Sequence, residues 1–484
     1  MRRMHESRIA ACFIVIATLF FGAVQTRAQD PQAGDAEKPK PAARSYPPVG
    51  VLDQDPSGDQ DSAPPLQPDT RPLTGIQILT LGSPVNLHSY WQSGFQYSNL
   101  IRSTALNQVS ATGWNSTSYV TGNLSLLESW SHSQLVVNYS GGGYFSTDSD
   151  QGNGNFQQFA LAQTFEWRRW QLALIDQFSY LPEASFGFGV GTGISIPGTG
   201  GSLGAPLPGM QDNYQPGQSI FTSVGPRYTN SFTTQAVYVL SPRSTFNVAG
   251  SYGILRFVET GNVPSNDTIF NVGYNYAVSK RNVIGVLYRF TAFRYLDNPQ
   301  ALNSHEAHAA FGRKITGRLA LQLFVGPEIT TFRVPIGTAT QQVTGSGGAA
   351  LNYVWGTNNL SLTYSRGLSN GSGLLVGSTT DRVQTNIQSR LSRHWEGNVN
   401  FGYARNASLD NSSESQIAQT YNSYFAGGGL SRPLSRSATF SLGYWAQVQY
   451  SQEPVCAAGT CSTRHWQQQV ILGFSWNTRP FVLR

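Results

Sequence analysis

Three short patterns in the chain contain residue types that could carry chemistry. His305-Glu-Ala-His308 is one residue shorter than the helical zinc motif, and on a strand its two histidines would point to opposite faces. Asp148 to Asn155 has the polar spacing of a calcium loop, but Gly152 stands at a ligand position and the closing acid is missing. Gly200-Gly-Ser-Leu-Gly204 fits the esterase pattern, which needs a strand, a turn and a helix around it. Because no nucleophile, base and orienting group fall at matching positions, we expect neither an enzyme nor a bound metal or cofactor.

The cysteines divide into one near the start of the chain and a close pair near its end. Cys456 and Cys461 enclose Ala-Ala-Gly-Thr, a spacing that favours a local disulfide in an exported protein. A metal pair is the alternative, but no histidine or second cysteine pair completes such a site. Cys12 lies in a segment that we expect to be removed.

Residues 1–28 have the pattern of a secretory signal peptide. A basic start is followed by the apolar run Phe13 to Phe21, and Thr26-Arg-Ala28 offers a cleavage site. Residues 29–80 follow as a linker rich in proline and aspartate, which has too few apolar residues to fold and is expected to be disordered in the periplasm. The remaining residues, 81–484, are expected to form one domain.

The composition of that domain is unusual for a soluble protein. Charged residues make up 12% of the chain, about half the ordinary share. Lysine occurs only at positions 38, 40, 280 and 314, while Asn, Gln, Ser and Thr fill the polar positions. No segment after the signal has the roughly 20 continuous apolar residues of a membrane helix. The pattern suits surfaces that face lipid or an uncharged lumen.

From about residue 88 the chain alternates between apolar and polar residues. Phe270, Val272, Tyr274 and Tyr276 alternate with Asn271, Gly273 and Asn275, and Thr439 to Tyr450 behaves likewise except at Trp445. Alternation of this length predicts long strands with one apolar face and one polar face. Their length suits tilted strands that cross a bilayer.

Short turn-like clusters separate these strands in pairs at a near-constant interval, broken once between Trp170 and Ser241. The clusters are Trp130–Ser133, Trp167–Trp170, Ser241–Ser244, Ser279–Asn282, Thr316–Arg318, Gly356–Asn358, Ser392–His394 and Ser435–Ser437. The connections between them are longer and rich in Gly, Asn, Asp and Ser: 99–117, 146–155, 182–227, 258–267, 296–304, 333–341, 367–381, 406–419 and 451–464. This asymmetry predicts an all-β, transmembrane, antiparallel up-and-down barrel with short periplasmic turns and long extracellular loops. We count about 18 strands, with 16 as the alternative; a β-propeller would need four short strands in each repeat.

In this architecture the chain resembles the porin-like outer-membrane β-barrels of Gram-negative bacteria, over about residues 80–478. The last strand, Gln467 to Trp476, looks like the closing strand that the barrel assembly machinery recognises in this class, although eight further residues follow it. The resemblance implies location in the cell outer membrane among lipid and lipopolysaccharide, and it allows a homo-oligomer. No basic-aromatic stripe indicates nucleic acid as a partner.

The polar face of the strands predicts the lumen. By parity, the inward residues are Arg289, Glu328, Arg382, Asn386, Arg390, Asn400, Gln447 and Gln469. A lumen of amides with scattered charges would pass small polar solutes with a weak preference for anions. The same residues would also suit a plugged barrel that displays loops, and a third function open to barrels of this size is polysaccharide export.

Two further features concern the long connections. The connection 182–227 is the longest, and between Glu183 and Arg227 its only charged residue is Asp212. It therefore predicts a loop that folds into the lumen and narrows it, with Phe186, Phe188 and Asp212 as constriction residues; a mobile surface loop is the alternative. Arg256, Arg294, Arg366 and Arg405 precede other long connections and could bind lipopolysaccharide phosphates or simply be solvated at the rim.

Overall fold

The fold was established with a computed structural model of the full chain. The structure describes residues 89–106, 114–147, 152–182, 226–258, 262–296, 300–333, 340–409, 420–457 and 460–483. The predicted signal peptide at 1–28, the predicted linker at 29–80, Gly200–Gly204, and Phe186, Phe188 and Asp212 of the longest connection lie outside these residues.

The described residues form long β-strands joined in chain order. The strands are β1 (Tyr90–Leu106), β2 (Asn115–Ser129), β3 (Ser133–Ser146), β4 (Gly154–Glu166), β5 (Trp170–Leu181), β6 (Arg227–Ser241), β7 (Ser244–Phe257), β8 (Ser265–Ala277), β9 (Asn282–Tyr295), β10 (Ala301–Lys314), β11 (Leu319–Arg333), β12 (Thr340–Trp355), β13 (Asn358–Ser369), β14 (Ser378–Arg390), β15 (Glu396–Ser408), β16 (Thr420–Pro433), β17 (Ala438–Ala457) and β18 (Thr460–Asn477), followed by the short β19 (Phe481–Val482). One 3-10 turn, η1 (Gly371–Gly373), lies between β13 and β14. Within the described part of the chain, no helix is long and apolar enough to span a membrane.

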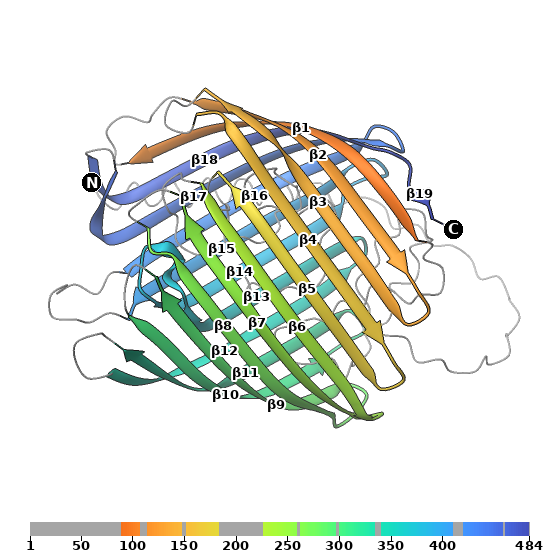
Figure 1. The fold of residues 1–484 in the computed structure, drawn as a ribbon, viewed down its shortest axis with the longest axis vertical. Coiled ribbons are helices and arrows are strands. Elements are labelled where there is room, and N and C mark those ends of the chain that lie inside the picture. Colours follow the sequence, from red (N-terminus) through yellow and green to blue (C-terminus); the bar gives the residue numbers. More distant parts are fainter. Residues whose placement is uncertain are drawn as a thin grey trace, which may run out of the picture. The chain divides into compact units, whose positions relative to one another are not determined.

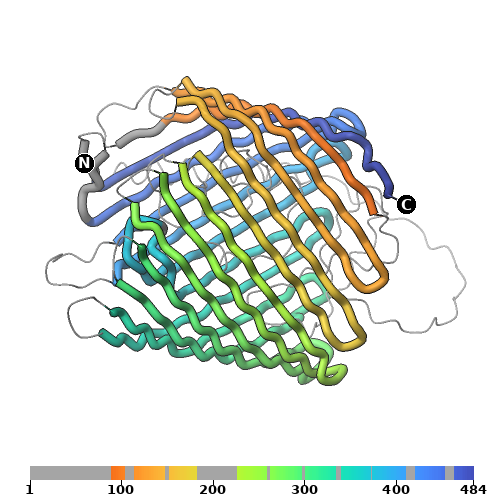
Figure 2. The backbone as a smooth tube through the Cα atoms, in the orientation of Figure 1, coloured from red at the N-terminus to blue at the C-terminus, as the bar shows by residue number. Residues whose placement is uncertain are grey.

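Each long strand pairs antiparallel with its neighbours in sequence, and the sheet closes on itself (Figure 1). Closure is made by β1 and β18, where Gly94 lies opposite Asn477 and Leu106 opposite His465. Figure 2 shows the strands running diagonally across the near wall, as the tilt of a barrel requires. The prediction of an 18-strand up-and-down barrel is therefore confirmed over the described residues. β19 adds a two-residue pairing with Tyr90 and Trp91 beside the closure.

The two faces of the barrel wall differ as the alternation predicts. Large apolar side chains on one face are exposed, among them Val325 (68%) and Val343 (69%). The opposite face carries buried polar side chains such as Asn247, Asn275 and Gln467. Because a closed barrel leaves no unpaired strand edge, every strand can satisfy its backbone groups while its apolar face contacts lipid.

The predicted short turns are correct, whereas several long connections are shorter than predicted. β1 continues to Leu106 and β2 begins at Asn115, so the first connection does not span 99–117. Likewise β17 and β18 extend to Ala457 and Thr460 inside the predicted connection 451–464. The polar ends of these strands look like loop sequence, but their backbone groups still pair with the neighbouring strand.

The strand extension places the two late cysteines directly opposite each other, since the register pairs Cys456 with Cys461 across β17 and β18. Opposite residues of an antiparallel pair have Cα atoms about 4.5–5.5 Å apart, which lies within the range that a disulfide requires. The disulfide remains a prediction.

We expect the purified mature protein to resist alkylation by iodoacetamide in denaturant until a reductant is added, after which two sites become labelled. Intact-mass measurement before and after reduction checks this expectation. A C456S/C461S variant is the control, and labelling of the unreduced wild-type protein would contradict the disulfide.

Candidate functional site

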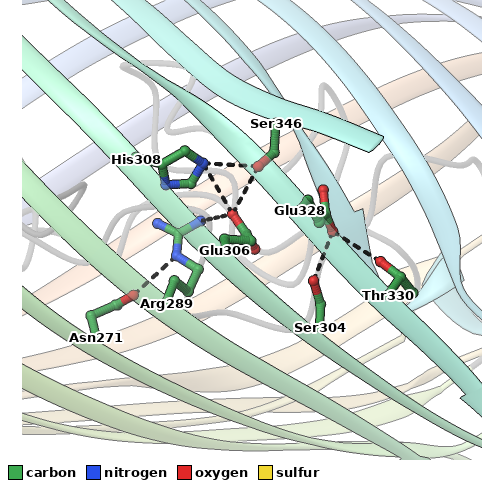
Figure 3. Close-up of polar contacts among 8 residues, drawn as sticks. All are labelled: Asn271, Arg289, Ser304, Glu306, His308, Glu328, Thr330 and Ser346. Carbon is green, nitrogen blue, oxygen red and sulfur yellow. Dashed lines mark hydrogen bonds and ion pairs between the residues drawn. The ribbon is translucent and has the colours of Figure 1, made fainter. Parts of the chain in front are cut away.

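A row of polar side chains crosses the inner face of strands β8 to β11 in register. Asn271 lies opposite Arg289, Arg289 opposite Glu306, and Glu306 opposite Glu328. All four alternate with exposed outward residues, for example Tyr288 on β9 and Ile329 on β11. The alternation of each strand therefore turns single polar residues from four strands into one cluster (Figure 3).

One half of this cluster is organised around Glu306, whose side chain is buried. Its Oε2 atom lies 3.9 Å from Nη1 of Arg289 and 3.4 Å from Nε2 of His308. Arg289 also donates from Nε to Oδ1 of Asn271 at 3.0 Å. Ser346 on β12 completes the group, because its hydroxyl lies 2.8 Å from Nε2 of His308 and donates to Glu306 at 3.4 Å. Four strands thus hold one carboxylate in place.

The other half holds Glu328, which is also buried. Its Oε1 atom accepts hydrogen bonds from the hydroxyl of Ser304 at 3.0 Å and of Thr330 at 3.4 Å. Two carboxylates in opposite register would repel each other, and Arg289 on the far side of Glu306 offsets part of that repulsion. The cluster consequently presents two carboxylates and one guanidinium to the interior.

The backbone beside this cluster is irregular. The β10–β11 register passes from Glu306–Glu328 to Ala309–Val325, and the intervening pairs at Ala307 and His308 are missing. Pro327, which has no N–H to donate, stands at this break. Gly326 stands beside it, where a Cβ atom would collide with the carbonyl oxygen of Ala307. A glycine is therefore required for β11 to pass this close to β10.

Of the predicted lumen residues, the structure brings Arg289 and Glu328 together in this cluster. Asn386 and Asn400 form a second inward pair, opposite each other on β14 and β15. Gln447 and Gln469 lie on β17 and β18, where Gln447 is opposite Gln467 and Gln469 is opposite Arg102 of β1.

The two remaining predicted residues lie on β14. Arg382 faces Ala404 in the inward row of that strand. Arg390 lies instead at the short-turn end, where its Nη2 atom is 3.8 Å from Oε1 of the exposed Glu396.

Sequence reasoning missed Glu306, His308 and Asn271. The signal was present, because Leu302, Ser304, Glu306 and His308 share one parity on β10, and register with β9 brings Glu306 to Arg289. The expected separation of the two histidines holds, since His308 is buried inside whereas His305 is exposed beside the hydroxyl of Tyr288, 2.8 Å away. Among the described residues, no group of three or more His, Cys, Asp or Glu side chains could hold a metal ion.

An apolar cluster occupies the inner face on the other side of the barrel. Its buried members come from β1 to β4 and β15 to β18: Leu100, Tyr119, Tyr144, Phe156, Ala404, Phe425, Trp445 and Ile471. Trp445, the exception to the alternation of its strand, fits here because Gly427 and Gly443 leave space for its ring. The interior is therefore polar on one wall and apolar on another.

The segment between β13 and β14, residues 370–377, extends into the interior at the long-connection end. The hydroxyl of Tyr295 on β9 donates to the carbonyl of Asn370 at 3.3 Å, and the Asn370 amide reaches Ser265 on β8 at 3.5 Å. The amide of Val263 donates to the carbonyl of Gly373 at 2.8 Å. These partners lie on or beside β8 and β9, several strands away from β13. The segment therefore extends along the inner face of the barrel wall.

Packing and backbone geometry support this inward position. Leu375 is buried with Tyr421 of β16, and Val376 packs with Phe293, Tyr295, Leu302 and Phe332. Gly371, Gly373 and Gly377 all have positive φ, at 79°, 84° and 79°. At Gly373 a side chain would also strike the ring of Phe257. The glycines thus permit a tight fold, and the Leu-Leu-Val run between them anchors it.

A closed antiparallel barrel with an apolar outer wall and polar inner residues is the architecture of outer-membrane β-barrels, because lipid tolerates no unpaired strand edge. The chain therefore has the architecture of an outer-membrane β-barrel.

Solved structures with a similar barrel share little sequence with the chain. The outer membrane protein OpdK of Pseudomonas aeruginosa has a TM-score of 0.41 and 9% identity, covering 80% of this chain and 99% of that one. OccAB3 of Acinetobacter baumannii gives 0.41 and 10%, with 80% and 99% covered. OccK2 (OpdF) of Pseudomonas aeruginosa gives 0.42 and 8%, with 80% and 98% covered. No protein-family model and no curated protein matches the sequence.

Proposed function

We propose that the protein is a passive channel that lets small polar solutes cross the outer membrane. The observation that carries this proposal is the inward row from Asn271 to Glu328, in which charged side chains are held in fixed positions on the inner face of a closed barrel. A purely structural barrel gains nothing from two carboxylates in opposite register, whereas a channel uses such groups to attract and orient solutes.

The inward segment 370–377 acts as a constriction in this proposal. It packs against the inner face of β8 to β11 and β16, so it reduces the cross-section at the long-connection end. The predicted constriction by connection 182–227, through Phe186, Phe188 and Asp212, stays a separate prediction. Deleting residues 186–222 without a change in conductance would contradict it.

A second candidate function is display of the long connections by a barrel with a closed interior. The buried apolar cluster that includes Tyr119, Phe156 and Trp445 favours it, because side chains lining open water would be exposed. The burial of Glu306 and Glu328 favours it for the same reason. Uptake of neutral sugars of increasing size by liposomes containing the protein separates the two functions. A channel gives size-limited swelling, and a closed barrel gives none.

Several partners belong to the same proposal. The closing strand β18 provides the site for the barrel assembly machinery, and outer-membrane lipid with lipopolysaccharide surrounds the apolar wall. A homo-oligomer within the membrane is compatible with this arrangement. The channel has no catalytic role and carries no cofactor in this proposal.

Neutralising the inner carboxylate of Glu306 is expected to shift ion selectivity toward anions. E306Q removes one negative charge and leaves Arg289 in place, so the anion-to-cation permeability ratio should rise by about twofold or more. The reversal potential in a salt gradient across a planar bilayer measures this ratio.

The matched control is E128Q, which makes the same charge change at the short-turn end of β2 on the outward face. It should leave the reversal potential unchanged. Equal shifts in E128Q and E306Q would mean that the inner cluster does not line the conducting path.

A further inference from the structure

Arginines recur on the outward face of the barrel at the long-connection ends of strands β7 to β18. They are Arg256, Arg294, Arg333, Arg366, Arg405 and Arg464, on β7, β9, β11, β13, β15 and β18. Each shares the parity of exposed lipid-facing residues, as Arg294 does with Tyr288 and Arg366 with Tyr364. We call these six residues the arginine rim.

The strand register arranges five of the six rim arginines, all except Arg256, in two rows. In the first row, Asn266, Arg294, Ala301 and Arg333 lie opposite one another across β8 to β11. In the second row, Arg366, Asp381, Arg405 and Asn422 do so across β13 to β16, and Tyr450 and Arg464 continue it on β17 and β18. Asp381 is the one outward-facing carboxylate among the side chains described on these twelve strands. The rim therefore carries a marked excess of positive charge.

Neighbouring acceptors hold several of these guanidinium groups. Arg294 donates from Nη1 to Oδ1 of Asn303 at 2.8 Å, and Arg366 donates from Nη1 to Asp381 at 3.1 Å. Arg256 donates from Nη2 to Oδ1 of Asn266 at 2.6 Å. The bonds that Arg294 and Arg366 make to the described part of the chain all use Nη1, so Nε and Nη2 of each can form a fork that matches two oxygens of a phosphate.

The position of the rim identifies its ligand class. The guanidinium groups stand just beyond the lipid-facing wall and next to outward aromatic rings, including Tyr364, Tyr403 and Tyr424. The backbones of arginines on alternate strands are about 10 Å apart, so a suitable ligand is one that contacts two guanidinium groups at once. A lipid with more than one phosphate group can do so while its acyl chains cover the apolar wall.

We propose that the arginine rim binds a phosphorylated glycolipid of the outer leaflet, through bidentate contacts from arginines on alternate strands. This inference rests on the proposed orientation, in which the long connections face the cell exterior. It is independent of whether the interior conducts.

The test compares two triple variants with the same change in charge. R294Q/R333Q/R405Q removes half of the rim, and R243Q/R281Q/R313Q removes exposed arginines from the short-turn end. Binding of bisphosphorylated lipid A and of the same lipid without phosphates is measured by native mass spectrometry of the full-length barrel in detergent. Heat-dependent mobility on gels verifies that each variant is folded.

The rim variant is expected to bind bisphosphorylated lipid A about tenfold or more weakly than the wild type. The short-turn variant should bind it as the wild type does, and the dephosphorylated lipid should bind all three proteins alike. Equal losses in both variants, or wild-type binding that is insensitive to removal of the phosphates, would overturn the proposal. Single-channel conductance of the rim variant should be unchanged, so a failure of the channel function would appear separately.

Discussion

Deletion of residues 371–376 is expected to raise the single-channel conductance by about twofold or more, because it removes the part of the 370–377 segment that crosses the interior. The deletion joins Asn370 to Gly377. Since Ser369 and Ser378 already lie opposite each other, the product is a two-residue Asn-Gly hairpin, the connection that antiparallel strands favour most. The barrel should therefore fold normally, and planar-bilayer recordings measure the effect.

A point variant tests whether the conductance depends on the packed position of the 370–377 segment when its length is unchanged. L375S places a hydroxyl at a buried apolar contact with Tyr421 and should release the segment, giving a noisier and larger conductance. L391S is the control, because Leu391 is exposed at a short turn. If the deletion variant folds and conducts like the wild type, residues 370–377 are not the constriction.

Substitution of Gly326 by valine is expected to lower the free energy of unfolding by about 3 kcal/mol or more, or to prevent assembly. The added side chain would collide with the backbone of β10 at Ala307 and His308, which cannot move without opening the pairing between the two strands. The same movement would separate Glu306 and His308 from Arg289. Urea unfolding of the protein in lipid vesicles, followed by tryptophan fluorescence, gives the free energy.

Gly345 provides the matched control, because it lies opposite Pro327 on the adjacent strand β12 and has open space where a Cβ atom would stand. G345V should fold with an unfolding free energy within about 0.5 kcal/mol of the wild type. Similar stability of G326V and G345V would refute the close approach of β10 and β11 at the inner cluster.

The barrel could be predicted from the sequence because period-two alternation and hairpin spacing are local signals. Phe270 to Tyr276 alone defines two faces, and the short turns fix the direction of each strand. The exact ends of strands at the long connections could not be predicted, since polar residues such as Asn99 and Ser116 remain paired or bonded beyond the apolar belt. Backbone pairing there does not depend on an apolar side chain.

The inner site was only partly predictable. The alternation of each strand placed Arg289 and Glu328 on the inner face. Which residues surround them depends on the register between strands, and this register places Glu306 between them. The inward segment 370–377 carried a weaker signal. Leu374-Leu375-Val376 is an apolar run within a glycine-rich connection, and exposure of such a run to water is unfavourable. The prediction was instead based on the longer connection 182–227, which has few charged residues.

The most direct test of the account is a single-channel recording of the purified protein in planar bilayers. We predict stepwise, voltage-independent conductance that needs no added cofactor. Deletion of residues 371–376 should increase this conductance. A correctly folded barrel that inserts into the bilayer but shows no conductance, with or without the deletion, would contradict the channel and leave a closed, surface-displaying barrel.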